Sequence, residues 1–276
     1  SHPGRRGQDF RGYPGGADGS SRPCPPPSRP GLGLIVNFWE SVSRETEPIP
    51  NPENRLPVTV MARLSPDDFQ EITGVSDPVL ERLKAYEALL VKWQQKSNLV
   101  GSASLEDAWR RHFLDSAQLG PILATSIKDS GKIIADIGSG AGFPGLVLAI
   151  TAASSMDGAE IHLVESNERK CAFLREVNRA TEAEAIIHHS RIENLQEFKA
   201  DVIISRALAP LDKLLFYAFP VLKKGGKCFF LKGKKWREEL TQAQKKWIIK
   251  DSAIQSLSDT SGMVLKLEAI AHRDDS

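Results

Sequence analysis

The chain has 276 residues, of which 41% are hydrophobic, and a formal net charge of +1 at pH 7. This length allows one sizeable core with a small appendage and argues against two large independent domains. The three cysteines, Cys24, Cys171 and Cys228, are too few and too scattered for a disulfide framework or a metal site, so we expect no metal and a reducing, cytoplasmic environment. No apolar run approaches the ~20 residues of a membrane span, so we expect no membrane association.

Residues 1–60 differ in composition from the rest of the chain. They contain 11 of the 17 prolines and 8 of the 21 glycines and show no sustained helical or strand periodicity. Such a segment buries too little apolar surface to offset its ordering entropy, and we predict a disordered Pro/Gly-rich extension. The chain begins with Ser1, and Met61 stands where the composition changes, so we expect Met61 to be the natural start. The extension is then foreign to the natural protein or, alternatively, an organellar transit peptide.

The next segment, residues 61–125, is predicted to be a helical cap in front of a sheet. Two helix starts carry a proline in the first turn, Ser65-Pro66 and Asp77-Pro78. A further helical stretch runs from about Ser104 to Leu119 and ends at Gly120-Pro121. Apolar residues follow the second start at helical spacing: Val79, Leu83, Tyr86, Leu90 and Trp93.

Residues 126–276 alternate apolar strands with helices, which predicts an α/β domain whose mostly parallel sheet is covered on both faces. Ligands of such sheets bind beyond the carboxyl ends of the strands, so functional residues are expected directly after strands. The predicted strands are Lys132–Ile137, Glu160–Val164, Ala185–His189, Asp201–Ile204, Lys227–Leu231 and Met263–Ile270, and the predicted helices span about 144–153, 167–181, 210–223 and 235–247.

A glycine-rich turn follows the first strand. The turn contains four glycines, at positions 138, 140, 142 and 145. Glycine allows a positive φ and a close approach of a ligand to the backbone, which we expect at Gly138 and Gly140. The string Gly-x-Gly-x-x-Gly that ends at position 145, with Glu165 20 residues later, fits a dinucleotide site as well as an S-adenosylmethionine site. The turn alone does not separate the two cofactors.

Two carboxylates favour S-adenosylmethionine. Asp136 ends the first strand, where it would hold water or amides around a cationic ligand and repel a pyrophosphate. Glu165 ends the second strand and is placed to accept both ribose hydroxyls. The alternative is that Asp136 caps the turn and Glu165 caps the helix that follows.

The chain resembles the bacterial GidB family, also called RsmG, the small-subunit ribosomal RNA guanine-N7 methyltransferases. The resemblance covers about Leu80 to Ile270 and implies a Rossmann-like class I methyltransferase fold with a seven-stranded sheet. It rests on Asp136–Gly145, Leu163–Ser166 with Arg169-Lys170 and Phe173-Leu174, Ile204–Leu208 and Leu231–Gly233, and in the cap on Tyr86–Trp93, Asn98-Leu99 and Arg111–Ser116. Gln94 and Val100 depart from the pattern, where the family usually has Asn and Thr, which puts the substrate contacts of the cap in doubt.

The resemblance implies cofactor contacts at Gly138, Phe143, Ile192, Glu193 and Arg206. Ile192 would pack on the adenine face and Glu193 would meet polar cofactor atoms, whereas the alternative is that these two residues begin an ordinary helix. With Asp136, Gly140 and Glu165 they complete the predicted cofactor site.

The implied chemistry needs no general base, because guanine N7 presents an in-plane lone pair to the methyl group. The enzyme must align the reactants and stabilise the developing charge. Accordingly, Ser205–Leu208 replaces the Asn/Asp-Pro-Pro-aromatic motif by which enzymes that methylate amino groups hold an NH₂. Arg206 is the predicted catalytic residue and would donate to guanine O6, a phosphate or the cofactor carboxylate. Its alternative role is a salt bridge with Asp201 or Asp212.

Ten Lys or Arg residues lie between Lys223 and Lys250, against Glu238 and Glu239, with Trp236 and Trp247 among them. This stretch is typical of an RNA-binding surface, or alternatively of a solvated helix face. The predicted RNA contacts are Lys232, Lys234 and Lys235 together with Arg111 and His112 of the cap, although His112 is also spaced to pair with Asp115.

The predicted function is methylation of guanine N7 in 16S ribosomal RNA by a monomeric enzyme that acts on ribosomal RNA or the small subunit. The target base must lie in a loop or be extruded from its stack. Another class I methyltransferase activity, on a small molecule or protein, would retain the cofactor residues but have no use for the basic stretch. A dinucleotide-binding module would bind ADP-ribose and transfer no methyl group.

Overall fold

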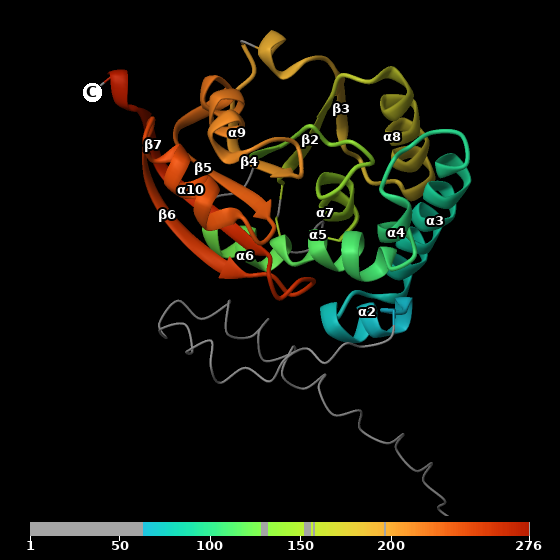
Figure 1. Cartoon of the computed structure of the whole chain (residues 1–276). Coiled ribbons are helices and arrows are strands. Elements are labelled where there is room, and N and C mark those ends of the chain that lie inside the picture. The colour runs from blue at the N-terminus through green and yellow to red at the C-terminus, as the bar shows by residue number, and fades with distance from the viewer. Residues whose placement is uncertain (1–62, 128–131, 152–155, 157, 196, 276) are drawn as a thin grey trace, which may run out of the picture. The chain divides into compact units, whose positions relative to one another are not determined.

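A computed structural model describes residues 63–127, 132–151, 156, 158–195 and 197–275. The predicted extension, residues 1–60, lies outside this part of the chain, as does Met61. Within the described ranges, seven strands form one sheet in the order β3-β2-β1-β4-β5-β7-β6 (Figure 1). The strands are β1 Ile133–Ile137, β2 Glu160–Glu165, β3 Ile186–His189, β4 Ala200–Arg206, β5 Leu222–Lys232, β6 Trp247–Gln255 and β7 Met263–His272.

The first five strands are parallel and the last two are antiparallel to their neighbours. β1 pairs in parallel with both β2 and β4, β2 with β3, and β4 with β5. β7 runs antiparallel to β5 and to β6. The carboxyl ends of β1 to β5 therefore meet at one edge of the sheet, with the order reversing between β1 and β4, as the alternation of strands and helices predicts.

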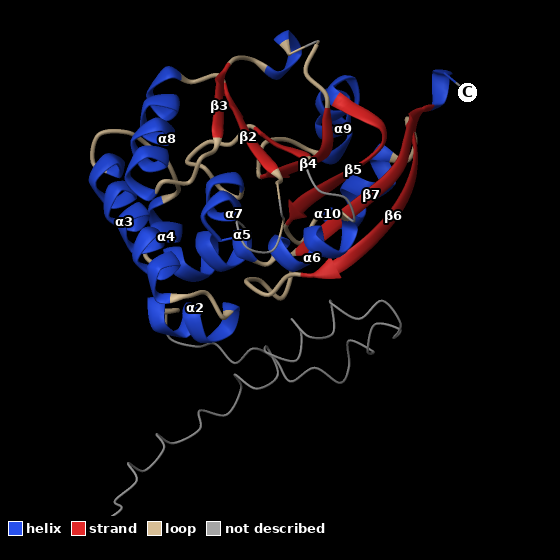
Figure 2. Ribbon diagram, turned by 180° about the vertical axis from the view of Figure 1, so that it is seen from behind, coloured by secondary structure: helices blue, strands red, loops and turns tan. Residues whose placement is uncertain are grey.

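Helices cover both faces of the sheet (Figure 2). Neighbouring residues of β1 belong to different hydrophobic cores. Ile134 packs in the core formed with α7, α8 and the N-terminal helices, and Ala135 packs in the core formed with α9 and α10. The helices are α2 Pro66–Thr73, α3 Asp77–Gln94, α4 Ser102–Leu105, a π-helical turn Trp109–Leu114, α5 Asp115–Ala117, α6 Leu119–Ser126, α7 Gly145–Thr151, α8 Glu168–Thr181, α9 Leu211–Ala218 and α10 Trp236–Ala243, with 3₁₀ turns at Ile192–Asn194, Phe219–Val221 and Arg273–Asp275.

Local capping explains where two of these helices begin. Ser65 and Asp68 form a reciprocal capping box at α2, and the side chain of Asn167 accepts from the Lys170 amide at the start of α8. Such caps satisfy amides that have no acceptor inside the helix. These starts agree with the sequence signals.

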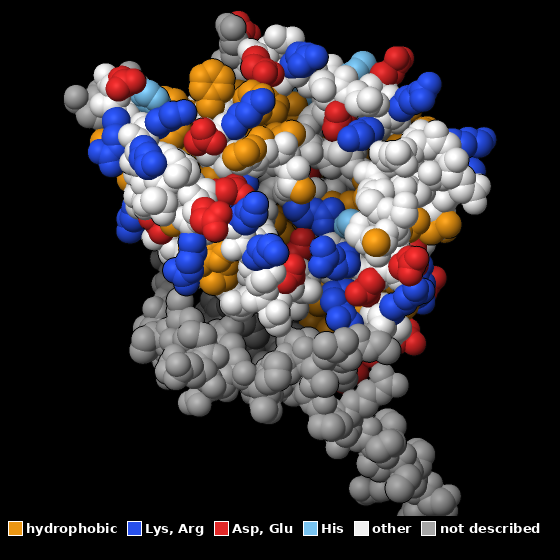
Figure 3. Space-filling view, viewed as in Figure 1, with side chains coloured by type: hydrophobic (Ala, Val, Ile, Leu, Met, Phe, Trp, Pro, Cys, Tyr) orange, Lys and Arg blue, Asp and Glu red, His pale blue; other side chains and the backbone are white. Residues whose placement is uncertain are grey.

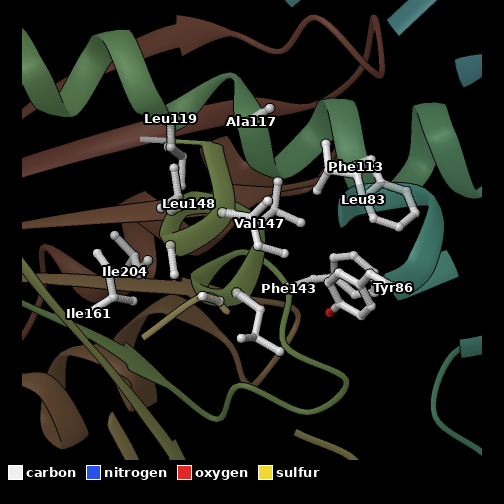
Figure 4. Packing of buried hydrophobic residues seen from close by; sticks show 14 of the residues in the cluster. Leu83, Tyr86, Phe113, Ala117, Leu119, Phe143, Val147, Leu148, Ile161 and Ile204 are labelled. Atoms are coloured by element: carbon white, nitrogen blue, oxygen red, sulfur yellow. The ribbon is translucent and has the colours of Figure 1, made fainter. Parts of the chain in front are cut away.

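The N-terminal helices share their core with the sheet. The Tyr86 ring of α3 stacks on Phe143, with centroids 5.1 Å apart, and meets Phe113 edge-on at 5.3 Å. Figure 4 shows Tyr86 and Phe143 side by side, with Leu83 and Val147 in the same packed cluster. Because the Phe143 ring belongs to the glycine-rich turn, packing of α3 helps to fix the turn.

Three predictions of secondary structure were wrong in detail. The helix expected over 235–247 ends at Ala243, and the chain enters β6, a strand absent from the predictions. β6 is an edge strand with much exposed surface, so it has little apolar alternation to reveal it. The helix expected over 210–223 ends at Ala218. Pro121 does not follow a helix but lies in the first turn of α6. A backbone N–H at this position would have no acceptor within the helix, so proline is tolerated there.

Candidate functional site

A cavity of about 920 Å³ lies at the carboxyl ends of the strands. Figure 3 shows a hollow on this face with basic and acidic side chains around it. The glycine-rich turn, the ends of β2, β4 and β5, the segment after β3, the turn between β6 and β7, and the N-terminal helices all contribute. Of the predicted site residues, the lining includes Gly138, Gly140, Phe143, Glu165, Ile192, Glu193, Arg206, Arg111, His112 and Lys232.

The glycine-rich turn has the backbone that its sequence predicts. Gly138 has a φ of 72° and Gly140 a φ of 58°, both in the left-handed region that favours glycine. A Cβ on Gly138 would lie 2.6 Å from Cδ1 of Leu208, whereas one on Gly140 would meet only the Gly138 carbonyl, at 3.8 Å. The turn thus leaves backbone open to a ligand.

Glu165 has the capping role and stands at the cavity, where the ribose contact is predicted. Its Oε2 accepts a hydrogen bond from the Gly140 amide at 3.0 Å, and its Oε1 accepts from the Asn167 amide at 2.7 Å. The residue therefore ties the turn to the start of α8. It also lines the cavity, although it is largely buried.

Asp136 lies behind the turn and does not line the cavity. It is fully buried, and its Oδ2 accepts from the Gly145 amide at 2.9 Å. Within the described residues, Oδ1 has no hydrogen-bond partner. This bond from a neighbouring amide agrees with both roles considered for Asp136, holding the amides of the turn and capping it.

Burial raises the pKa of Asp136 to about 7, against the opposing effect of the Gly145 hydrogen bond. A raised folded-state pKa favours the protonated form, so this contribution to stability is present below pH ~4 and is lost as pH rises through about 7. We expect Asp136→Asn, which cannot titrate, to gain about 2–4 kcal/mol of stability relative to the native protein between pH 4 and 8.

Urea unfolding at several pH values measures this difference, and titrations common to both proteins cancel in it. A difference that stays constant across the range would show that folding does not raise the pKa of Asp136. The expected direction is a relative gain for the Asn variant as pH rises.

His112 and Tyr86 both stack on Phe143. The His112 ring lies 4.9 Å from the Phe143 centroid, and its Nε2 is 3.1 Å from Oγ of Ser104. Because the Ser104 hydroxyl donates to the Gly101 carbonyl, Nε2 of His112 donates to Ser104, and its buried Nδ1 has no partner within the described residues. Burial, with the charges of Arg206 and Arg111, lowers the pKa of His112 to about 3. The pairing with Asp115 that its spacing suggested is not formed.

The Arg206 side chain is held next to the glycine-rich turn by three contacts. Its Nη1 donates to the Arg111 carbonyl at 2.7 Å and lies 3.4 Å from Oδ2 of Asp115, and its Cζ is 5.1 Å from the Phe143 centroid. Within the described ranges, these bonds use Nη1 alone, so Nε and Nη2 are available as donors. The salt bridges suggested with Asp201 or Asp212 are not formed, because those carboxylates pair with Lys223 and Lys246.

Asp115 is a site residue that the sequence analysis did not identify as the partner of Arg206. Its Oδ1 accepts from Ser258, at 2.5 Å, and from the Gln118 amide group, at 3.0 Å. Burial raises the pKa of Asp115, an effect that Arg206 and Ser258 oppose. Asp115 therefore connects the N-terminal helices, β4 and the β6–β7 turn. Its place beside Arg206 comes from tertiary packing and has no local sequence signal.

The predicted cofactor contacts after β3 lie at the cavity wall. Ile192 and Glu193 form a 3₁₀ turn, with Ile192 half-buried and Glu193 exposed. Both residues therefore stand where the cofactor contact is predicted, and the 3₁₀ turn is the short helix start of the alternative.

The predicted RNA contacts divide into two groups. The Lys232 side chain is buried and committed inside the protein, since its Nζ lies 2.7 Å from Oε2 of Glu239 and donates to the Ala209 carbonyl. Lys234 and Lys235 are exposed before α10 and do not line the cavity. Arg111 is exposed at the cavity, where its Nη1 lies 3.7 Å from Oδ2 of Asp259.

The basic stretch is not one continuous surface. Its residues are spread over β5, α10 and β6, and several are paired with carboxylates, as Lys227 and Lys250 are with Glu268. Trp236 and Trp247 are buried and therefore do not offer free faces for stacking on bases. Their position among the basic residues therefore adds no aromatic surface for RNA.

Fold and cavity together define a class I methyltransferase that uses S-adenosylmethionine. Within the described ranges, no cluster of three or more His, Cys, Asp or Glu side chains is arranged to hold a metal ion. None of the helices described is both long and apolar enough to cross a membrane.

The GidB family model, described as rRNA small subunit methyltransferase G, matches residues 79–264, and the chain belongs to this family. A ribosomal RNA small subunit methyltransferase G of Paramagnetospirillum magneticum is 49% identical over 208 residues, which cover 75% of this chain and 97% of that protein. The one of Rhodospirillum rubrum is 45% identical over 210 residues, 76% of this chain and 100% of that protein. The fibrillarin of Aeropyrum pernix, solved with natively bound S-adenosyl-L-methionine, is 14% identical with a TM-score of 0.44, over 56% of this chain and 76% of that chain.

Proposed function

We propose that this protein transfers a methyl group from S-adenosylmethionine to N7 of a guanine in small-subunit, 16S ribosomal RNA. Family membership supports the ribosomal RNA substrate. The observation that supports N7 is the state of His112, the one histidine that lines the cavity in the described part of the chain. Its pKa of about 3 keeps it neutral and makes it a weak proton acceptor at neutral pH, although its Nδ1 lone pair has no partner within the described residues. Methylation of guanine N7 needs no proton acceptor.

The residues present fit the cofactor. The Gly140 backbone is open to a ligand, the Leu208 side chain lies beside Gly138, and Glu165 stands at the end of β2 with both oxygens oriented by amides. We propose that the two glycines and Glu165, with Phe143, Ile192 and Glu193, hold the cofactor, and that Asp136 acts through the turn by capping Gly145. When bound, S-adenosylmethionine supplies an electrophilic methyl group on a sulfonium.

Arg206 is the proposed catalytic residue. Its guanidinium is held in one orientation by Asp115, the Arg111 carbonyl and the Phe143 ring, with Nε and Nη2 left as donors. A rigid fork of this kind suits guanine O6 or a carboxylate. Because Asp115 neutralises much of its charge, Arg206 aligns the reactants without opposing the positive charge that develops on the base.

We propose a division of labour between residues 61–125 and 126–276, in which the helical cap supplies Arg111 and His112 to the substrate side and the sheet holds the cofactor. We also propose that the protein acts as a monomer in the cytoplasm. Size-exclusion chromatography with light scattering tests the monomer.

Transfer of tritiated methyl groups tests the function directly. The protein is incubated with labelled cofactor and either small ribosomal subunits or protein-free 16S RNA, and nucleosides are mapped afterwards. Label in 7-methylguanosine is expected. Label in protein alone, or no label although the cofactor binds, would contradict the proposal and favour another class I methyltransferase or a binding module.

The exposed lysines before α10 give a second test. We expect Lys234→Glu combined with Lys235→Glu to weaken RNA binding at low salt by about 10-fold and to lower the salt dependence by about one to two phosphate contacts. Cofactor affinity is expected to stay unchanged, because neither side chain lines the cavity.

The matched control reverses two adjacent lysines at the other end of α10, Lys245→Glu with Lys246→Glu. Both are exposed, and the net charge changes equally. If both double variants weakened RNA binding equally, the effect would come from net charge and not from the position of the lysines. If Lys234→Glu with Lys235→Glu lowered cofactor affinity, the proposed separation of RNA contacts from cofactor contacts would be refuted.

A further inference from the structure

The cavity extends well beyond the proposed cofactor contacts. Its volume of about 920 Å³ lies at the upper end of the range for small-molecule sites. Gly138, Glu165 and Ile192 lie at or after the ends of β1, β2 and β3, which form one side of the sheet. The other side, beyond β4, β5 and β7, is bounded by Arg206, the cap and the β6–β7 turn. A cofactor on the first side leaves the second for the target nucleotide.

Most charged side chains on this second side are already committed. Asp115 accepts from several donors and pairs with Arg206, and Lys232 is held by Glu239 at 2.7 Å. The looser pair is Arg111 with Asp259, at 3.7 Å, and both side chains are partly exposed, by 52% and 35%. These two are the charged groups that a ligand can engage at small cost.

Asp259 is an oriented acceptor in the β6–β7 turn. Its Oδ1 accepts from both the amide and the hydroxyl of Ser261, each at 2.8 Å, whereas Oδ2 has only Arg111 nearby among the described residues. Burial alone would raise the pKa of Asp259, but the Ser261 hydrogen bonds and the charge of Arg111 outweigh it and hold the pKa below its ordinary value. The carboxylate is therefore ionised at neutral pH.

An ionised carboxylate repels the phosphates of RNA, so its place in an RNA-binding cavity favours a contact with donors on a base. Guanine carries N1–H and N2–H₂ donors on its Watson–Crick edge, while N7 lies on the opposite side of the base. Adenine presents a lone pair at N1 instead. When N7 of the target faces the cofactor side, the donor edge faces away from it, toward the side that holds the β6–β7 turn.

We propose that Asp259 reads the Watson–Crick edge of the target guanine, with Oδ2 accepting from N1–H and N2–H₂. This inference rests on the proposed function and adds to it a residue that selects guanine over adenine. Arg111, once Asp259 has bound the base, is released to meet a phosphate beside it. The contact also requires an unpaired target, because pairing in a duplex would occupy the same edge.

The first experiment uses the native protein. After nucleoside mapping has located the methylated position, small-subunit RNA is prepared with guanosine or inosine there. Inosine lacks the N2 amine but keeps N7. The native protein is expected to lose about 10- to 100-fold in kcat/KM on inosine, because the charged acceptor loses the N2–H₂ donor and keeps only N1–H. Equal rates on the two substrates would overturn the inference.

The second experiment replaces Asp259 by Asn. Oδ1 of the amide still accepts from Ser261, while an NH₂ group replaces Oδ2 and meets the guanine donors with a donor. We expect Asp259→Asn to lose about 10- to 100-fold in kcat/KM on guanosine and less than about 3-fold more on inosine, so that the two changes are not additive. Cofactor affinity, measured by calorimetry, is expected to be unchanged.

Asp251→Asn is the matched control. Asp251 is exposed on β6, outside the cavity, where it accepts from Gln244. It removes the same charge and should keep native discrimination. Asp259→Asn with native discrimination, or Asp251→Asn with the same loss, overturns the inference. If the native protein methylates no guanine N7 in small-subunit RNA at all, the proposed function itself fails, which is a different result.

Discussion

Gly138→Asp is expected to abolish binding of S-adenosylmethionine. The new Cβ would lie 2.6 Å from Leu208, at a φ of 72° that side chains rarely adopt. The exposed end of Leu208 can move aside, so the larger effect comes from a carboxylate inserted where the backbone must meet the cofactor. A displaced or unpaired charge there costs several kcal/mol, and we expect affinity to fall by about 100-fold or more. Isothermal calorimetry measures the change.

Gly74→Asp provides the control for backbone strain. Gly74 ends α2 with a φ of 68°, nothing lies within 4 Å of its built Cβ, and it does not line the cavity. The Gly74→Asp variant should have a lower free energy of unfolding but native affinity for the cofactor. A Gly138→Asp protein that binds the cofactor normally would mean that the turn does not cradle it. Gly138→Ala is expected to have a smaller effect than Gly138→Asp, since it adds the contact with Leu208 and the strain of a positive φ but no charge.

Arg206→Ala is expected to lower kcat/KM for RNA methylation by about 100- to 1,000-fold, because the donors that align the reacting groups are lost. Arg206→Lys should recover little of this, since an ammonium keeps the charge but not the planar fork. Single-turnover methylation of small subunits measures the effect. Calorimetry on the same variants then shows which group Arg206 contacts, since cofactor affinity falls only if the guanidinium holds the cofactor carboxylate.

The matched control is Arg237→Ala. Arg237 also lies over an aromatic ring, 4.3 Å from the Trp236 centroid, but it is exposed on α10 and does not line the cavity. It should retain methylation close to native. If Arg206→Ala kept native kcat/KM, Arg206 would be a structural residue and not a catalytic one.

The sequence predicted the architecture well because its signals are local. Apolar strands followed by helices, and a glycine turn after the first strand, predicted the parallel sheet and the edge at which the cavity lies. Positions directly after strands were sufficient to find Glu165 and Arg206 at the cavity. The strand β6 escaped because an exposed edge strand has no clear apolar alternation.

Side-chain partners were harder to predict than positions. Asp136 was predicted at its strand end, but the sequence does not show that its carboxylate is fully buried against the Gly145 amide. Arg206 and Asp115 are 91 residues apart, and helical spacing suggested His112 for Asp115 instead. Exposure of the tryptophans in the basic stretch likewise depends on α10 and β6 packing into a core that sequence charge does not reveal.

The contacts of the N-terminal helices also set an order of events during synthesis of the chain. The hydroxyl of Tyr86 binds the Ala141 carbonyl, 55 residues later, and Trp93 donates to Glu176, 83 residues later. Asp115 gains its bond from Ser258 after 143 residues. The helices made first therefore complete their packing last. A nascent chain that stops before the β6–β7 turn would lack the turn that packs against Asp115 next to Arg206. Such a truncated product is expected to be cleaved readily by proteases.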